Sequence, residues 1–271
     1  MSLAARLRHS VRAYPTLLRI GFAGMVAYRA EFLVWILTTN MPLVMMALWN
    51  AVAADGPVGR FGQQELNTYY LAVLVVRIST SSWMVWELTM DIRHGRLATR
   101  LLRPLHPLLA YSAEHLAAVP MRALVVAPLV GILVWVMDFQ LPLADPVRLG
   151  IFVLSLIGAW FLLFFTMVLI GSLAMFVDSA LSVFEIWLGI HFVLSGYLVP
   201  IELLPSWAVK LSYALPFWYT LGFPVETAVG PWDVPTALRA LAIQWLYLAG
   251  MALAAMLVWR RGMRRFVAFG G

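Results

Sequence analysis

The sequence lacks several residue types that enzymes use for chemistry. It contains no cysteine, which excludes disulfides, thiolate metal sites and cysteine nucleophiles. Its single lysine, Lys210, does not stand in a phosphate-binding GxxxxGK[ST] motif, so the chain cannot bind ATP in that way. The five histidines include no HExxH motif and no pair spaced four apart. We therefore assign no catalytic residue, cofactor site or metal ligand, and we expect the chain not to be an enzyme.

Charged residues are also scarce. They make up 12% of the 271 residues, whereas 63% are hydrophobic and the mean hydropathy is +0.87. A soluble domain carries about a quarter charged residues, so this chain cannot cover itself with a hydrated surface. We interpret it as an all-α integral membrane protein. The formal net charge of +6 is small for this length, so we relate it to topology and lipid head groups and expect no nucleic-acid partner.

The N-terminal arm, residues 1–31, carries scattered arginines and no signal-peptide core. Its partly amphipathic pattern, broken at Pro15, favours a helix that lies on the inner leaflet. The alternative is an orientation signal with no further role. The rest of the chain, residues 32–271, is expected to form one transmembrane domain.

This domain contains six apolar segments, each close to the ~20 residues that cross a bilayer. The fourth and fifth are separated by a tight turn at Asp178 and Ser179. The sequence therefore predicts six transmembrane helices. The expected spans are Phe32–Ala54, Thr68–Leu88, Glu114–Met137, Leu149–Val177, Ala180–Val199 and Thr236–Trp259.

The distribution of arginine predicts the orientation of these spans. The N-terminal arm has five arginines, the central loop 89–112 has four, and the basic tail 260–271 has four. Arginine is retained on the cytoplasmic side of a membrane. We therefore expect both termini and the central loop to lie in the cytoplasm, which agrees with an even number of spans.

The central loop holds arginines at spacings of three, four and three, at Arg93, Arg96, Arg100 and Arg103. On a helix this spacing places the four guanidinium groups on one side. One interpretation is a topogenic loop whose charges only determine orientation. The other is a docking element for a cytoplasmic partner.

The outer segment 200–235 is rich in proline, tryptophan and tyrosine, yet it remains rather apolar. Irregular backbone at membrane depth is tolerated only where protein or water satisfies it. We expect short helices that re-enter the outer leaflet between spans five and six; the alternative is an ordinary outer loop with interfacial aromatic residues. We assign an outer gate to this region. The gate residues are Tyr197, Pro200, Pro205, Trp207 and Pro216.

Ionisable residues within spans are expensive to bury and therefore mark candidate functional positions. Arg77 lies near the middle of the second span and is followed by a polar run, while Glu185 and His191 lie in the fifth span. We assign these three residues to a translocation path or a subunit seam. A snorkelling or interhelix-bonded structural arginine is the alternative for Arg77. A direct Arg77–Glu185 pair is not expected, because the two residues lie at different depths.

Several motifs together with the six-span plan resemble an ABC-2 type transporter permease, in the branch of uncharacterised ABC-2 permeases. The resemblance covers essentially the whole chain. The motifs are Ser195–Pro200 (SGYLVP), Leu204–Trp207 (LPSW), Leu215–Phe217 (LPF), Gly95–Leu97 (GRL), Leu101–Pro104 (LLRP) and Arg260–Gly262 (RRG) with Phe266.

This resemblance implies a permease subunit of an exporter in a bacterial cytoplasmic (inner) membrane. Separate ATPase subunits would bind ATP and magnesium, and a second permease copy or a sister permease would complete a dimer among membrane lipids. The loop after span two would hold a coupling helix that fits a groove of the ATPase, formed here by Asp91, Arg93, Arg96, Arg100 and Arg103. The substrate would be an amphipathic drug, a peptide, a lipid-like molecule or a glycan. The alternatives are an intramembrane enzyme acting on a lipid-linked substrate and a structural subunit that transports nothing.

Overall fold

The computed structural model describes residues 3–27, 40–136 and 145–266. These residues are almost entirely helical and contain no strand, which confirms the all-α prediction. Residues 32–39 of the expected first span lie outside the described residues, as does residue 137 at the end of the third span. What is described of the first span is α3 (Met41–Val52), which continues into the short 3-10 helix η1 (Ala53–Asp55).

Four helical segments are long and apolar enough to cross a membrane: Gln63–Arg93, Pro107–Trp135, Pro146–Met175 and Val234–Met263. They correspond to the second, third, fourth and sixth expected spans. The segments Met41–Asp55 and Ala180–Leu194 are apolar but shorter. The described residues therefore support a multi-pass membrane protein, and six remains a prediction.

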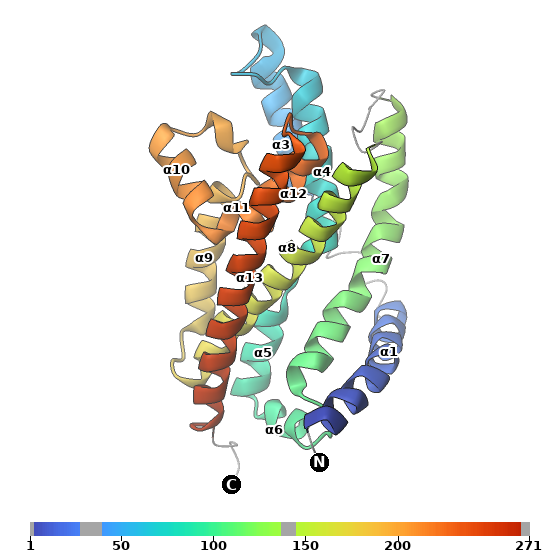
Figure 1. The fold of residues 1–271 in the computed structure, drawn as a ribbon, viewed down its shortest axis with the longest axis vertical. Helices are drawn as coiled ribbons and strands as arrows, with labels where there is room; N and C mark the ends of the chain where they lie inside the picture. The colour runs from blue at the N-terminus through green and yellow to red at the C-terminus, as the bar shows by residue number, and fades with distance from the viewer. Residues whose placement is uncertain (1–2, 28–39, 137–144, 267–271) are drawn as a thin grey trace.

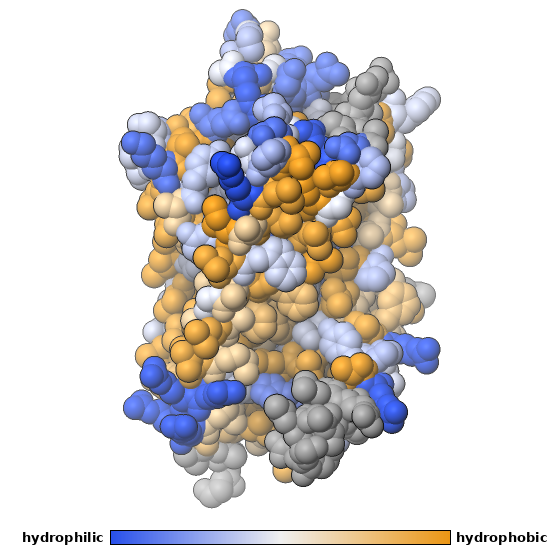
Figure 2. Space-filling model, viewed as in Figure 1, coloured by the Kyte–Doolittle hydropathy of each residue, from blue (hydrophilic) through white to orange (hydrophobic). Residues whose placement is uncertain are grey.

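The helices form an elongated bundle in which α8 (Pro146–Ser172) lies at the centre, against α13 (Val234–Met263), α4 (Gln63–Thr80) and α5 (Met84–Arg93) (Figure 1). The helix α7 (Pro107–Val136) packs against α1 (Leu3–Ala27). On the visible face, apolar residues predominate in the middle and the most polar residues gather at both ends (Figure 2). This pattern suits a protein whose midsection lies in lipid.

The beginning of α1, the short helix α6 (Arg96–Leu101) and the end of α13 lie at the same end of the bundle, which we call the inner end (Figure 1). The opposite, outer end carries the junction of α3 and α4 and the helix α10 (Ser206–Ala214). The three arginine-rich regions thus gather at one end, as the charge distribution predicts for a shared side of the membrane.

The helix α1 continues through Pro15, so the predicted break at this residue is wrong. Proline removes one backbone donor, but the surrounding turns of this 25-residue helix persist. Gly21 lets α1 approach α7 closely, because a Cβ at this position would lie 3.0 Å from the Cβ of Ala117. Tyr14 and Ser112 add a side-chain hydrogen bond of 3.2 Å between the two helices.

The second expected span is not one continuous helix. It breaks after Thr80, where Ser81 adopts an extended conformation (φ −63°, ψ 137°), and it resumes as α5 at Met84. Arg122 of α7 donates hydrogen bonds to the carbonyl and hydroxyl oxygens of Ser81, at 2.6 and 2.7 Å. These bonds compensate polar groups that the break leaves without helical partners. The expected span Thr68–Leu88 thus lies within the candidate span Gln63–Arg93, with a break that the sequence did not predict.

A buried glutamine links three elements in the core. Gln244 of α13 donates hydrogen bonds to the carbonyl oxygens of Ser155 in α8, at 2.9 Å, and of Tyr219 in α11 (Pro216–Thr220), at 2.8 Å. Gly158 makes room for it, because a Cβ there would lie 2.7 Å from the Gln244 amide oxygen. These contacts attach the outer segment to the central helix.

Candidate functional site

The four arginines of the central loop do not share one helical face. The helix α5 ends at Arg93, and Gly95 then adopts a left-handed conformation (φ +71°) before α6 begins at Arg96. Glycine adopts this conformation without steric cost, so the chain turns sharply there. The prediction of a single arginine-bearing face is wrong for this reason.

Asp91 is the centre of the structure that forms at this turn. Its side chain is 5% exposed, and it accepts hydrogen bonds from Nε of Arg96 and Nε of Arg100, each at 2.8 Å. The Tyr111 hydroxyl, from α7, donates a third bond of 2.7 Å to the same carboxylate. Asp91 thus holds α5, α6 and α7 together.

Arg100 connects Asp91 to two further carboxylates, on α5 and α7. Its guanidinium group donates to Glu114 of α7 at 3.0 and 3.3 Å, donates to Glu87 of α5, and lies 4.2 Å from the centroid of the Tyr111 ring. Burial tends to lower the pKa of Arg100, but the carboxylates of Glu114 and Glu87 outweigh it, so the pKa lies above its ordinary value. We call Glu87, Asp91, Arg100, Tyr111 and Glu114 the inner clamp.

Among the remaining loop residues, Arg93 is hydrogen-bonded to another part of the chain, and others are exposed at the surface. Arg93 donates to the backbone carbonyl of Asp178 and so ties the end of α5 to the turn before α9 (Ala180–Leu194). Leu102 is 87% exposed, and the neighbouring Leu101 and Arg103 are also exposed. An exposed leucine pair beside a cation at the inner end is suited to contact with another protein.

The arginine spacing alone missed two parts of this site. Glu87 and Glu114 belong to the helices before and after the loop. Both are far from Arg100 along the chain, so the local arginine spacing could not predict their contact with it. The exposed Leu102 was visible in the sequence as one of two adjacent leucines in the LLRP motif. The sequence does not show which leucines of this loop are buried. In the structure Leu97 is buried in the core, whereas Leu102 is exposed.

Among the residues assigned to a path or seam, the structure brings Arg77 and His191 together but not Glu185. The guanidinium carbon of Arg77 lies 5.6 Å from the centroid of the Tyr197 ring, and its charge reaches His191. Nε2 of His191 makes a hydrogen bond of 2.9 Å with the Thr220 hydroxyl. Glu185 is exposed on α9 and makes no ion pair within the part of the chain that the structure describes.

The outer segment folds into short helices, as the sequence predicts. They are η3 (Ile201–Leu203), α10, α11 and α12 (Gly222–Val229). The helix α12 is almost fully buried against α4 and α8, whereas α10 lies at the outer surface. Whether these helices enter a lipid leaflet stays a prediction.

The residues assigned to the outer gate occupy different environments. Tyr197 and Pro200 are buried, Pro216 is partly buried, and Pro205 and Trp207 are exposed, Trp207 by 68%. They therefore do not form one cluster of buried side chains. The gate remains a hypothesis for the segment as a whole.

Helices from the first half of the chain hold the turn around Tyr197. The Tyr69 hydroxyl donates to the carbonyl of Gly196 at 2.7 Å, and the Tyr70 hydroxyl donates to the carbonyl of Leu198 at 2.8 Å. The indole of Trp49 donates to the same Leu198 oxygen at 3.0 Å. The turn that leads into the outer segment is thus bonded to both α3 and α4.

Glu226 of α12 is a buried carboxyl group that sequence reasoning did not assign to a site. It accepts a hydrogen bond of 3.1 Å from the indole of Trp218, while its Oε2 has no hydrogen-bond partner among the described atoms. Burial raises its pKa to about 7. Such a group responds to pH near neutrality.

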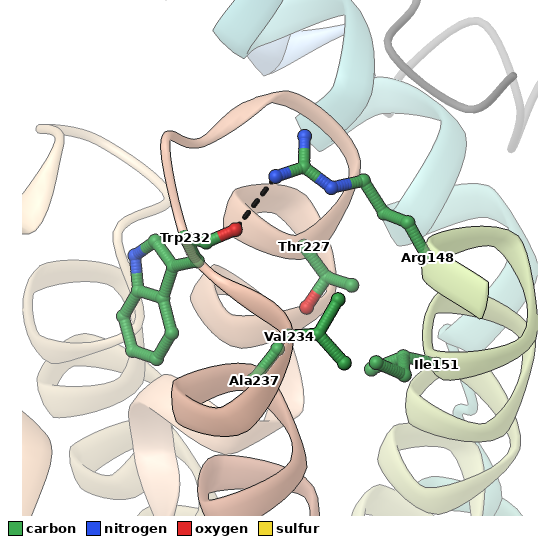
Figure 3. Close-up of a pocket in the computed structure, with 6 residues that line it drawn as sticks. All are labelled: Arg148, Ile151, Thr227, Trp232, Val234 and Ala237. Atoms are coloured by element: carbon green, nitrogen blue, oxygen red, sulfur yellow. Dashed lines mark hydrogen bonds between the residues drawn. The ribbon is translucent and has the colours of Figure 1, made fainter. Parts of the chain in front are cut away.

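A hollow at the outer end lies between α8, α12 and α13. Figure 3 shows Arg148 reaching over it to donate a hydrogen bond of 2.6 Å to the carbonyl of Trp232, above Ile151, Thr227 and Val234. Its empty volume is about 210 Å³ even when space open to solvent is included. Ligand pockets commonly hold ~300–1,000 Å³, so this hollow is small for a transported molecule. Within the described ranges, no group of three or more histidine or carboxylate residues is placed to hold a metal ion.

The fold and the inner clamp define a multi-pass helical membrane protein with a rigid, partly exposed loop at one end. The sequence model of the ABC-2 family transporter protein matches residues 40–270 of the chain. The match covers most of the chain, which therefore belongs to the ABC-2 transporter family. A comparison with individually curated proteins gave no match.

Proposed function

We propose that this chain is the permease subunit of an ATP-binding cassette exporter in a bacterial cytoplasmic membrane. Six spans of each copy would line a path at a dimer interface, and separate ATPase subunits would bind ATP and magnesium. The partner permease would be a second copy or a sister permease. Family membership and the helical, apolar fold support this assignment. The termini and the 89–112 loop would face the cytoplasm, where the ATPases are.

The inner clamp is the observation that carries this proposal. A docked ATPase would press on Leu102 and Arg103, which are exposed immediately after α6. Because Arg100 binds Asp91, Glu87 and Glu114, movement of α6 would be transmitted to both α5 and α7. Coupling through a short helix requires such a rigid attachment, since a loose loop would absorb the motion.

The same geometry bears on the alternative of an intramembrane enzyme. Such an enzyme needs convergent acids or bases with a proton to exchange. The carboxylates that do converge, Glu87, Asp91 and Glu114, are ion-paired with Arg100, an arrangement that favours a structural clamp. The substrate we propose is an amphipathic molecule of the drug, peptide, lipid-like or glycan type, because the spans are mostly apolar.

Affinity purification of the full chain from its native membranes tests the proposal. We expect an ABC ATPase subunit to be recovered with it, together with ATP hydrolysis by the complex. Leu102→Asp combined with Arg103→Glu should lower the recovery of that subunit by about tenfold or more without changing the melting temperature of the permease. The matched outer-end control, Trp207→Asp with Lys210→Glu, should leave recovery unchanged. Equal recovery from both double variants would contradict the assignment of the inner surface.

A further inference from the structure

Two arginines lie partly buried beside the break in the second span. Arg77 lies on α4, one turn before the break, and Arg122 reaches the break from α7. Their charges interact. Arginine keeps its proton inside proteins, so both groups bring a full positive charge into the middle of the bundle.

The structure compensates Arg122 through backbone and hydroxyl oxygens, whereas Arg77 interacts mainly with the Tyr197 side chain. Arg122 donates hydrogen bonds to the carbonyl and hydroxyl oxygens of Ser81, where the C-terminal end of α4 concentrates partial negative charge. Arg77 faces the Tyr197 ring, and its Nε is buried without a hydrogen-bond partner. Within residues 3–27, 40–136 and 145–266, no carboxylate oxygen lies within 4.0 Å of either guanidinium group.

The groups around Arg77 do not supply a counter-charge. His191, Tyr197 and Arg122 are the titratable residues whose charges reach it, and none of them is an acid with an ordinary negative charge. The hydroxyl groups of the neighbouring polar run, Ser79 to Ser82, are already hydrogen-bonded to backbone groups or to Arg122. The N-terminal end of α5, which carries partial positive charge, begins at Met84 directly after this run. The region as a whole is positive.

We propose that the break between α4 and α5 is a binding site for the anionic oxygen group, carboxylate or phosphate, of an amphipathic molecule, with Arg77 as its main ligand. A buried guanidinium without an acidic partner is costly in a membrane, and a bound oxyanion would offset that cost. The Tyr197 ring beside Arg77 suits contact with an apolar body attached to that group. Arg77 is partly exposed overall, so the site is accessible from one side of α4.

This inference deepens the proposed function, on which it rests, because it specifies the charge of the exported substrate class. It also predicts a simple binding preference. An amphiphile with an anionic head should bind, and one with a cationic head and the same tail should not, because Arg77 and Arg122 repel it.

The experiment uses the purified full-length chain in a neutral detergent and follows its melting temperature during titration. Dodecyl phosphate is expected to raise the melting temperature in a saturable manner, whereas dodecyltrimethylammonium is not. Arg77→Gln should raise the half-saturating concentration of dodecyl phosphate by about tenfold or more, since it removes a charge-assisted hydrogen bond. Arg239→Gln, at an exposed arginine of α13, is the matched control and should leave it unchanged.

Two results would overturn the site. One is an equal response of the wild-type chain to both amphiphiles, and the other is an unchanged titration of Arg77→Gln. If Arg77→Gln does not fold, Arg77→Lys is the substitute variant, because it retains the charge. The comparison of the two head groups in the wild-type protein then still decides whether the site binds anions. None of these measurements needs the ATPase, so their failure is distinguishable from failure of the transporter assignment.

A second arm distinguishes the source of the anionic group. The titration is repeated in bilayer discs of phosphatidylcholine with and without phosphatidylglycerol. Competition by phosphatidylglycerol would identify a membrane lipid phosphate as an occupant, and undiminished binding of dodecyl phosphate would identify a separate amphiphile. Both results support the anion site, whereas loss of saturable binding in both kinds of disc would contradict it.

Discussion

Nε of Arg100 lies 2.8 Å from the Asp91 carboxylate, so this arginine points into the protein rather than toward a partner. The same guanidinium group reaches Glu87 and Glu114, on the helices either side of the loop. Arg100 therefore fastens α6 to the bundle. Its neighbours Leu102 and Arg103 remain exposed.

The first prediction concerns the difference between these two kinds of arginine. Arg100→Gln should lower the free energy of unfolding by about 2–4 kcal/mol, because it removes the partly buried charge that joins Asp91 to Glu87 and Glu114. Arg103→Gln should change it by less than about 0.5 kcal/mol, as expected at an exposed position. Thermal unfolding of the two purified variants measures the difference. Equal melting temperatures would mean that the clamp does not hold the loop.

A second prediction concerns the turn that carries Tyr197. Gly196 has φ +85°, and a Cβ there would lie 2.5 Å from the Tyr69 hydroxyl oxygen. Gly196→Ala should therefore cost about 1–3 kcal/mol through backbone strain and loss of the Tyr69 hydrogen bond. Gly189→Ala, in helix α9 with nothing near its Cβ, is the control and should be neutral or slightly stabilising. A melting temperature for Gly196→Ala at or above that of Gly189→Ala would be inconsistent with the described turn.

The third prediction concerns pH and Glu226. In the folded chain this carboxyl keeps its proton up to about pH 7, whereas its ordinary pKa is 4.5. The folded state therefore binds more protons between these values, and stability falls as pH rises from 4.5 to about 7 before levelling off. The loss amounts to roughly 3 kcal/mol at about 1.4 kcal/mol per pH unit.

Glu226→Gln should remove this dependence and should make the chain more stable than wild type above about pH 7. Melting temperatures of wild type and variant between about pH 5 and about pH 8 provide the test. Asp55→Asn is the control, because Asp55 is an exposed carboxyl at the outer end that does not act on Glu226 and should leave the slope in place. Parallel pH profiles for wild type and Glu226→Gln would show that Glu226 is ionised in the folded chain.

Much of the architecture was predictable from hydropathy, because long apolar segments and punctuating prolines depend on local sequence alone. The helices α10, α11 and α12 fall inside the segment where proline and aromatic residues predicted short helices. The break at Ser81 was not predictable in the same way, since hydroxyl residues occur within membrane helices and the partner Arg122 comes from another span.

The contacts of the inner clamp were likewise not predictable from local sequence. Arginine spacing on an assumed continuous helix placed the four guanidinium groups on one side, but the chain turns at Gly95, so that Arg100 faces the bundle while Arg96 stays largely exposed. Asp91, which the resemblance assigns to the coupling helix, forms ion pairs with both arginines. Local periodicity cannot reveal contacts such as that between Arg100 and Glu114, which depend on how the chain returns to the inner end.

The most direct test of the central claim is site-specific photo-crosslinking in intact membranes. A photoreactive amino acid replaces either Leu102 at the inner end or Trp207 at the outer end, which are 87% and 68% exposed. The account predicts that an ABC ATPase subunit crosslinks at Leu102 and not at Trp207. A chain that crosslinks to no ATPase at Leu102, or equally at both positions, would contradict it.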